Sequence, residues 1–334
     1  MANAREIQTR IKSIQDTMKI TNAMYMISSA KVKKARNALE HTEPYFAMLQ
    51  STIARMVRHL PEMEHRYFAA GCENGKKGMV QCEYAVEKND VQRRSDAETK
   101  KEVLKKEYAE GVQKKRRGFI VISADKGLAG AYNHNVIRLT EEWLKQGQDN
   151  LLFVVGELGR EYFVQHGIPV EMEFRYTVQD PNQTRARDIG DYVISLYDAG
   201  KLDELYVIYT QSVNSMQVEA KVQRLLPLEK EALAVTIPSD VYMEDIRMIP
   251  SAEKILENVV PDYVTGFIYG ALVESFCSEQ NSRMMAMEAA TDNAEKILKE
   301  LQITYNRVRQ GAITQEITEV IAGARAQKKR RQKS

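Results

Sequence analysis

The feature that most constrains the fold is a long C-terminal stretch with few helix breakers. No proline follows Pro261, and from about Thr265 to Ala324 only four glycines interrupt a run rich in Ala, Glu, Lys, Met and Leu. This composition favours one continuous helix, roughly 85–90 Å long at 1.5 Å per residue. A helix of that length exceeds what a single globular domain can cover, so we expect it to protrude.

Apolar and small residues recur along this stretch at alternating spacings of three and four, which is the pattern of a coiled-coil seam. The seam consists of Met284, Met287, Thr291, Ala294, Leu298, Leu301, Tyr305 and Val308 and, after a slip of one residue, Ile313, Ile317 and Val320. A narrow seam of this kind needs a second helix to cover it.

The N-terminal end of the chain supplies that helix. Residues 1–43 contain neither Gly nor Pro, and Pro44 is expected to kink a helix that then resumes. Its seam, at heptad spacing, consists of Ile7, Ile11, Ile14, Met18, Thr21, Tyr25, Ser28, Val32, Ala35 and Leu39. Because the two helices are the ends of one chain, we expect an antiparallel coiled coil with a globular domain at its base.

The middle of the chain has an α/β pattern. Strand-like runs occur at 118–123, 151–155, 170–175, 205–210 and 220–225, with helical patterns at 133–145, 159–166 and 185–199 between them. This alternation predicts a mostly parallel sheet with helices on its faces, a Rossmann-like α/β domain. The predicted organisation is an N-terminal shaft helix (1–60), a charged insertion or linker (61–117), the α/β domain (118–261, loop-rich from 226), a C-terminal shaft helix (262–324) and a basic tail (325–334).

Residues 71–116 differ in character from their neighbours. Glycines loosen the chain around Cys72 and Cys82, and a capping box at Ser95–Glu98 opens a highly charged helical pattern. We expect an exposed appendage with little to bury. Cys72 and Cys82 are a candidate redox pair, although the spacing of ten residues is a weak signal. The chain has only three cysteines, which predicts a reducing compartment rather than a disulfide scaffold.

No motif for catalysis or cofactor binding emerges. The loop Asp125–Gly130 follows a predicted strand, yet it matches neither GxGxxG nor GxxxxGK[ST], so its glycines are interpreted as a strand-to-helix turn. The histidines are scattered without the spacing of a zinc or nucleophile site. We therefore predict no catalytic residue, cofactor or metal. A dinucleotide-binding enzyme carried by the α/β domain remains one alternative.

The net charge is only +2, but it is unevenly placed. Lys31, Lys33, Lys34 and Arg36 form a basic cluster, and a second basic run spans 328–333. A solvated face and a disordered tail explain these runs without a ligand, and neither run has the interleaved aromatics that favour nucleic-acid binding. No stretch of about 18 uncharged apolar residues predicts a membrane span, and the N-terminus lacks the layout of a signal or transit peptide.

Three segments resemble the γ-subunit family of F-type ATP synthases. They read AREIQTRIKSIQDTMKITNAMYMISSAKVKKA, VISADKGLAG and SEQNSRMMAMEAATDNAEKILKELQITYNRVRQGAITQEITEVIAGA. The resemblance covers nearly the whole chain, whereas about 71–116 and the tail after Ala324 depart from the common bacterial pattern. It implies a non-catalytic central rotor whose partners are a ring of α and β subunits, an ε subunit and a membrane c-ring. The lack of a transit-peptide pattern favours a bacterial enzyme, with this chain peripheral on the cytoplasmic side of the plasma membrane.

The resemblance also assigns residues to this role. A polar group that would engage a β-subunit loop consists of Arg309, Gln310, Thr314 and Glu316. Met24 and Arg283 match positions linked to coupling, and the basic cluster would face acidic segments of β. Tyr242 and Glu244, near the base of the shaft, would face the c-ring or ε. A coiled-coil scaffold with no rotary role is the second alternative, and it predicts self-association instead of assembly with other subunits.

Overall fold

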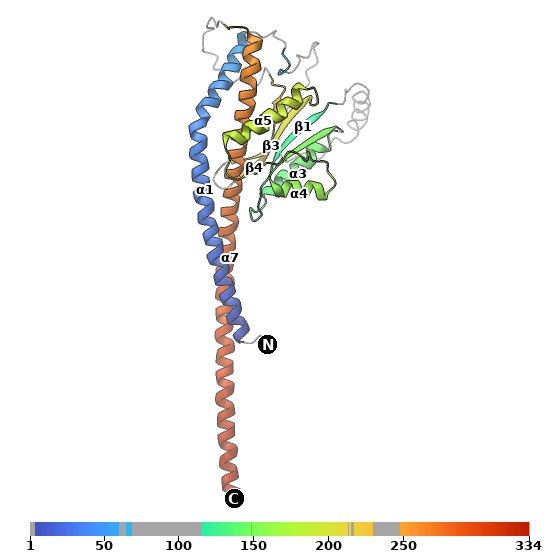
Figure 1. Cartoon of the computed structure of the whole chain (residues 1–334). Helices are drawn as coiled ribbons and strands as arrows, with labels where there is room; N and C mark the ends of the chain where they lie inside the picture. Colours follow the sequence, from blue (N-terminus) through green and yellow to red (C-terminus); the bar gives the residue numbers. More distant parts are fainter. Residues whose placement is uncertain are drawn as a thin grey trace, which may run out of the picture.

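The computed structural model describes residues 4–59, 65–68, 115–147, 149–212, 214, 217–229 and 248–333. Two long helices, α1 (Ala4–His59) and α7 (Ala252–Lys333), run side by side in opposite directions, and a smaller α/β head lies beside them (Figure 1). At 82 residues, α7 is roughly 120 Å long. The structure therefore confirms the predicted antiparallel shaft with an α/β domain at one end.

α1 matches the predicted N-terminal shaft helix, whereas α7 is longer than the predicted 262–324. Pro44 lies inside α1 and Pro261 lies inside α7, so neither proline ends its helix. The start of α7 at Ala252 corrects the prediction that the loop-rich stretch extends to Pro261, and the helix continues through the basic run to Lys333. Packing of both helices against each other and the head explains this, because tertiary contacts override the local cost of a proline.

Two contacts define the register of the shaft helices. The hydroxyl groups of Thr21 and Thr291 lie 2.8 Å apart and share a hydrogen bond. Phe46, 25 residues after Thr21, lies against Gly266, 25 residues before Thr291. A Cβ at position 266 would overlap the Phe46 ring, so the close approach there requires glycine. The equal spacing shows that the register continues unchanged past Pro44.

The predicted seam is confirmed over the paired length of the shaft. Every seam residue of α1, and those of α7 from Met284 to Val308, is buried or half-buried. The predicted continuation at Ile313, Ile317 and Val320 is wrong as an intramolecular seam, because these side chains are exposed. Ala4, the first residue of α1, lies as far from Thr21 as Val308 lies from Thr291, so α1 begins where the paired seam ends.

The head contains one four-stranded sheet of order β2-β1-β3-β4. Its strands are β1 (Arg117–Ile122), β2 (Asn150–Val155), β3 (Glu204–Ser212) and β4 (Val218–Leu226). β1 pairs in parallel with both β2 and β3, and β4 pairs antiparallel with β3. The sheet is therefore mostly parallel, as predicted.

The predicted strand at 170–175 does not form. The backbone contacts with the edge strand β2 are a single hydrogen bond from the Glu171 N–H to the Leu152 carbonyl at 2.9 Å and an isolated bridge between Val155 and Tyr176. The Phe174 side chain is buried, and its carbonyl oxygen accepts a hydrogen bond from the buried Arg160 guanidinium. The Phe174 carbonyl is therefore not available for pairing with a neighbouring strand. The segment lies at the edge of the sheet without extending it.

Among the residues that the structure describes, three helices cover the sheet: α3 (Tyr132–Leu144), α4 (Glu157–Gln165) and α5 (Gln183–Asp198). The helices α3 and α4 lie on the face away from the shaft, while α5 lies on the face toward α7 (Figure 1). A Cβ at Gly190 of α5 would lie 2.7 Å from the Thr265 hydroxyl of α7, so the two helices pack closely. The predicted appendage with Cys72 and Cys82, together with Tyr242 and Glu244, lies outside the described residues.

Candidate functional site: the unpaired end of α7 and the head–shaft junction

Beyond Val308, α7 continues as a single helix past the start of α1 (Figure 1). Its apolar side chains there have no covering helix among the described residues; Ile317 is 54% and Val320 72% exposed. An apolar stripe on an unpaired helix is a surface that another molecule can bury. The exposed large apolar residues of this end are Ile313, Ile317, Val320 and Ile321.

The predicted polar group lies on this unpaired end. Arg309, Gln310, Thr314 and Glu316 are all exposed. Thr314 donates its hydroxyl proton to the Gln310 carbonyl at 2.9 Å, an ordinary contact within a helix. Within the described part of the chain, neither Arg309 nor Glu316 forms an ion pair. The four residues thus lie near one another along the unpaired helix, and the charged groups of Arg309 and Glu316 are open to solvent.

The predicted basic cluster lies about halfway along α1 and is partly engaged by its own chain. Lys33, Lys34 and Arg36 are exposed and Lys31 is half-buried. Lys34 Nζ lies 3.8 Å from Asp180 Oδ1 of the head, a contact that solvent weakens. Burial raises the pKa of the Cys277 thiol to about 11, and the neighbouring Arg36 opposes that rise.

Met24 and Arg283, which the resemblance grouped, have different environments. Met24 is half-buried along the edge of the α1 seam. Arg283 is only 7% exposed, and its Nη2 donates to Glu279 Oε1 at 2.6 Å. Burial raises the pKa of Glu279, while the Arg283 guanidinium opposes the shift. The spacing of four residues between Glu279 and Arg283 is a signal of this pair that sequence reasoning overlooked.

A polar junction between the head and α7 was also missed. Ser275 Oγ accepts a hydrogen bond from the backbone N–H of Thr210 at 3.2 Å, and Ser278 Oγ donates to the Thr210 carbonyl at 3.2 Å. Beside them the Tyr132 hydroxyl is fully buried, and burial raises its pKa. Ser275, Ser278 and Glu279 share one face of α7, a pattern readable in the sequence. These contacts fasten the end of β3 to the shaft.

The loop Asp125–Gly130 lies at the carboxyl end of β1, the edge at which doubly wound folds bind nucleotides. Here the carbonyl oxygens of Lys126 and Gly127 accept hydrogen bonds from Arg283 Nη2, each at 3.1 Å. Leu128 and Gly130 have positive φ angles of 64° and 56°, so the loop turns sharply. The loop therefore directs acceptors at a cation of its own chain, which fits the turn interpretation rather than a phosphate cradle.

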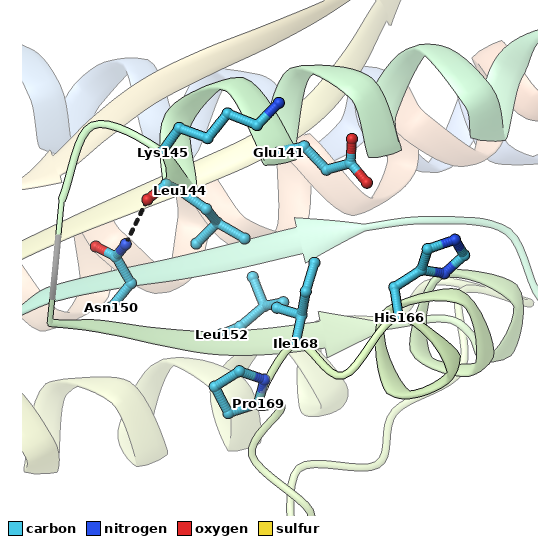
Figure 2. A pocket seen from close by; sticks show the side chains of 8 residues that line it. All are labelled: Glu141, Leu144, Lys145, Asn150, Leu152, His166, Ile168 and Pro169. Atoms are coloured by element: carbon cyan, nitrogen blue, oxygen red, sulfur yellow. Dashed lines mark hydrogen bonds between the residues drawn. The ribbon is translucent and has the colours of Figure 1, made fainter.

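A pocket of about 510 Å³ lies elsewhere, between the end of α3 and the start of β2 (Figure 2). Leu144, Leu152 and Ile168 give it an apolar floor, and Glu141 and His166 lie at its rim. The Asn150 amide donates to the Leu144 carbonyl at 3.0 Å and supports the turn beside the pocket. None of the sequence-predicted residues lines it.

None of the described helices has the continuous apolar stretch that crossing a bilayer requires. A family model described as ATP synthase matches residues 3–327. The ATP synthase gamma chain of Acetivibrio thermocellus is 41% identical over 333 residues, covering 98% of this chain and all of the relative. A sodium ion specific ATP synthase gamma chain of Acetobacterium woodii is 33% identical, covering 97% of this chain and 98% of the relative.

Solved structures agree at the level of the fold. A chain of the Euglena gracilis mitochondrial ATP synthase in rotational state 3 aligns with a TM-score of 0.59 at 15% identity, covering 97% of this chain and 94% of that chain. A central-stalk chain of the Tetrahymena thermophila enzyme aligns with a TM-score of 0.52 at 21% identity, covering 81% and 99%. Because the family model spans nearly all residues and the relatives match along their full length, this chain belongs to the ATP synthase gamma chain family.

Proposed function

We propose that this chain is the central rotor subunit of an ion-translocating ATP synthase. It couples ion flow through a membrane ring to ATP synthesis or hydrolysis in a separate catalytic ring. The observation that carries the proposal is the unpaired end of α7, which presents both an apolar stripe and an unpaired polar group beyond the reach of α1. Such a helix end is suited to insertion into a ring of partner subunits.

Asymmetry supplies the mechanism. Two helices of unequal length have no threefold symmetry, so a shaft of this kind cannot contact three identical catalytic subunits in the same way. Each subunit then experiences different contacts and adopts a different conformation, and rotation of the shaft exchanges these conformations. Differential contacts shift the populations at distant sites, which is a conformational coupling that requires no catalytic group on the shaft.

The polar group Arg309, Gln310, Thr314 and Glu316 would provide the strongest rotor-to-ring contact. A charge-assisted hydrogen bond from Arg309 to a β-subunit carboxylate is stronger than a neutral one, and Gln310 adds a neutral contact beside it. The exposure of both side chains supports this role, since they reach a partner without rearrangement of the shaft. The exposed Lys33, Lys34 and Arg36 of the basic cluster would contact acidic β segments, and Met24 would lie at a position linked to coupling.

The partners in this proposal are α and β subunits around the shaft, with ε and the c-ring at the head, where Tyr242 and Glu244 would contribute. This chain would be attached to the membrane peripherally, through the complex, on the cytoplasmic side of a bacterial plasma membrane. The chain itself would not be catalytic: its loop Asp125–Gly130 is engaged by Arg283 rather than open to a nucleotide.

Recovery of partners from native membranes tests the proposal. An affinity tag on this chain should recover α, β, ε and c subunits together with ATP hydrolysis activity. Recovery of only further copies of the chain would favour a coiled-coil scaffold. Nucleotide binding by the isolated chain at micromolar concentration would instead favour a dinucleotide-binding enzyme.

A further inference from the structure

The side chain of Asp125 joins three segments of the head. Its Oδ1 accepts a hydrogen bond from the backbone N–H of Glu157, at the start of α4, at 3.2 Å. Its Oδ2 accepts from the N–H groups of Val178 and Gln179, at 3.1 and 3.3 Å, and from the Thr177 hydroxyl. One carboxylate at the end of β1 thus holds both the α4 N-terminus and the 177–179 turn.

Arg283 holds the residues that follow Asp125 in the chain. Its Nη2 reaches the carbonyl oxygens of Lys126 and Gly127 from α7, and the carboxylate of Glu279 orients it. Because this guanidinium is buried, loss of its side chain would leave two loop carbonyl groups without a donor. The loop and the shaft helix are therefore joined through a buried guanidinium that is also paired with Glu279.

The turn that Asp125 holds is also connected to α1, the other shaft helix. Arg185 Nη1 donates to the carbonyl oxygens of Gln179 and Asp180, at 2.7 and 3.3 Å, and fixes the end of the turn. The Asp180 carboxylate then lies 3.8 Å from Lys34 Nζ of α1. A continuous series of contacts runs from α7 through the loop and the turn to α1.

We propose that Arg283 and Asp125 are positioning residues that fasten the head to the shaft. Arg283 holds the loop Asp125–Gly130 on α7, and Asp125 extends that hold to α4 and to the turn beside α1, so that head and shaft rotate together. Arg283 thus acts inside the chain and not as a contact to a catalytic subunit. We call this attachment of the head to the shaft, through Arg283 and Asp125, the latch. Its consequence for coupling rests on the proposed rotor function, whereas the latch itself does not.

Hydrogen exchange of the full-length chain tests the latch directly. Arg283→Met should raise exchange of the Glu157, Val178 and Gln179 amides, which donate to the Asp125 carboxylate, by about ten- to a hundredfold, because the loop that carries Asp125 loses its charge-assisted contact with α7. Arg283→Lys, which keeps the charge but not the fork, should give a smaller rise. The matched control is Arg307→Met, which removes an exposed arginine of the same helix and should leave this exchange unchanged.

Glu279→Gln tests whether the Arg283 contacts with the loop depend on the charge of Glu279. The amide oxygen can still accept from Arg283, so exchange of the Glu157, Val178 and Gln179 amides should rise by less than about threefold. Exchange of the central β3 amides reports whether the head as a whole stays folded. Unchanged exchange of the Glu157, Val178 and Gln179 amides for Arg283→Met, or an equal rise for Arg307→Met, would overturn the latch.

The assembled enzyme tests the consequence. In membrane vesicles containing Arg283→Met or Asp125→Asn, the ratio of ions pumped to ATP hydrolysed should fall severalfold, with assembly intact and Arg307→Met normal. A normal ratio in both variants would reduce the latch to local packing and refute its positioning role. If exchange rises as expected but the chain recovers no ATP synthase subunits, the rotor proposal fails while the latch stands.

Discussion

The two ends of α7 carry the same kinds of apolar residue in opposite environments. Ile268, near the head, is 1% exposed and packs in the core shared by α1, α5 and the sheet. Ile317, on the unpaired end, is 54% exposed, and no second helix of the described residues covers it. Burial of the first stabilises the chain itself, whereas the free energy of burying the second is available only to another molecule. One helix therefore serves folding at one end and binding at the other.

The largest expected effect contrasts these two isoleucines directly. Ile268→Ala should lower the free energy of unfolding by about 2–5 kcal/mol, because it removes buried methyl groups and leaves a cavity. Ile317→Ala should change it by less than about 0.5 kcal/mol, since the side chain is exposed and alanine favours a helix. Denaturant unfolding of the full-length chain, followed by circular dichroism, measures both.

The contrast would fail if the two variants lost similar stability, because the unpaired end would then be packed by the chain itself in solution. The reverse contrast is expected on assembly. Ile317→Ala should weaken recovery of partner subunits under increasing salt or denaturant, and Ile268→Ala should affect recovery only as far as it unfolds the chain.

The next prediction concerns the polar group on the unpaired end. A partner left unpaired in a partly dry ring costs on the order of 1–3 kcal/mol, and 1.4 kcal/mol is about a factor of ten in rate. The double variant Arg309→Ala, Gln310→Ala should therefore assemble normally and lose ATP hydrolysis and synthesis together, by about ten- to a hundredfold. Leu301→Ala, on the paired seam, is the control and should instead lower shaft stability. Full turnover in the double variant would remove this group from the mechanism.

The shaft could be predicted from the sequence because its signal is local and repeated. Seam spacing and the absence of breakers gave both helices and their pairing from Ile7 to Leu39 and from Met284 to Val308. The same spacing misplaced Ile313 and Ile317, because a seam predicts that a helix will cover it but not which chain supplies that helix. Where α1 begins relative to α7 depends on the three-dimensional register, which the Thr21–Thr291 contact fixes.

The head illustrates a different limit. Its four strands and three helices follow from hydrophobic runs, but the 170–175 pattern was interpreted as a strand although a single buried Phe174 and the Arg160 contact decide otherwise. Arg283 was assigned by resemblance to a coupling position. Its burial against Lys126 and Gly127 joins residues more than 150 positions apart in the chain, and no local pattern contains such a contact.

A smaller effect is expected from the polar pair in the paired shaft. Thr21→Val removes the shared hydrogen bond, but the Thr291 hydroxyl keeps its bond to the Met287 carbonyl at 2.9 Å. Each single valine substitution should therefore cost about 0.5–1.5 kcal/mol of unfolding free energy, and the double variant less than the sum of the two. Urea unfolding in a double-mutant cycle measures the coupling. Additive losses would show that the two hydroxyl groups do not interact.

The smallest effect should come from the end of the unpaired helix. The structure continues α7 to Lys333, yet the last seam-like apolar residues come before Ala324, and five of the residues from 328 to 333 are Lys or Arg. A terminal helix segment frays readily and contributes little when nothing apolar is buried against it. Truncation after Ala324 should therefore change the unfolding free energy by less than about 0.5 kcal/mol, within the usual range for surface changes. ATP hydrolysis and the ratio of pumping to hydrolysis in the assembled enzyme should stay within about twofold of the full-length value. If the truncated chain fails to join the catalytic ring, the basic run is part of the binding surface, and the unpaired end acts through charge over its whole length rather than through the stripe and the polar group before Ala324.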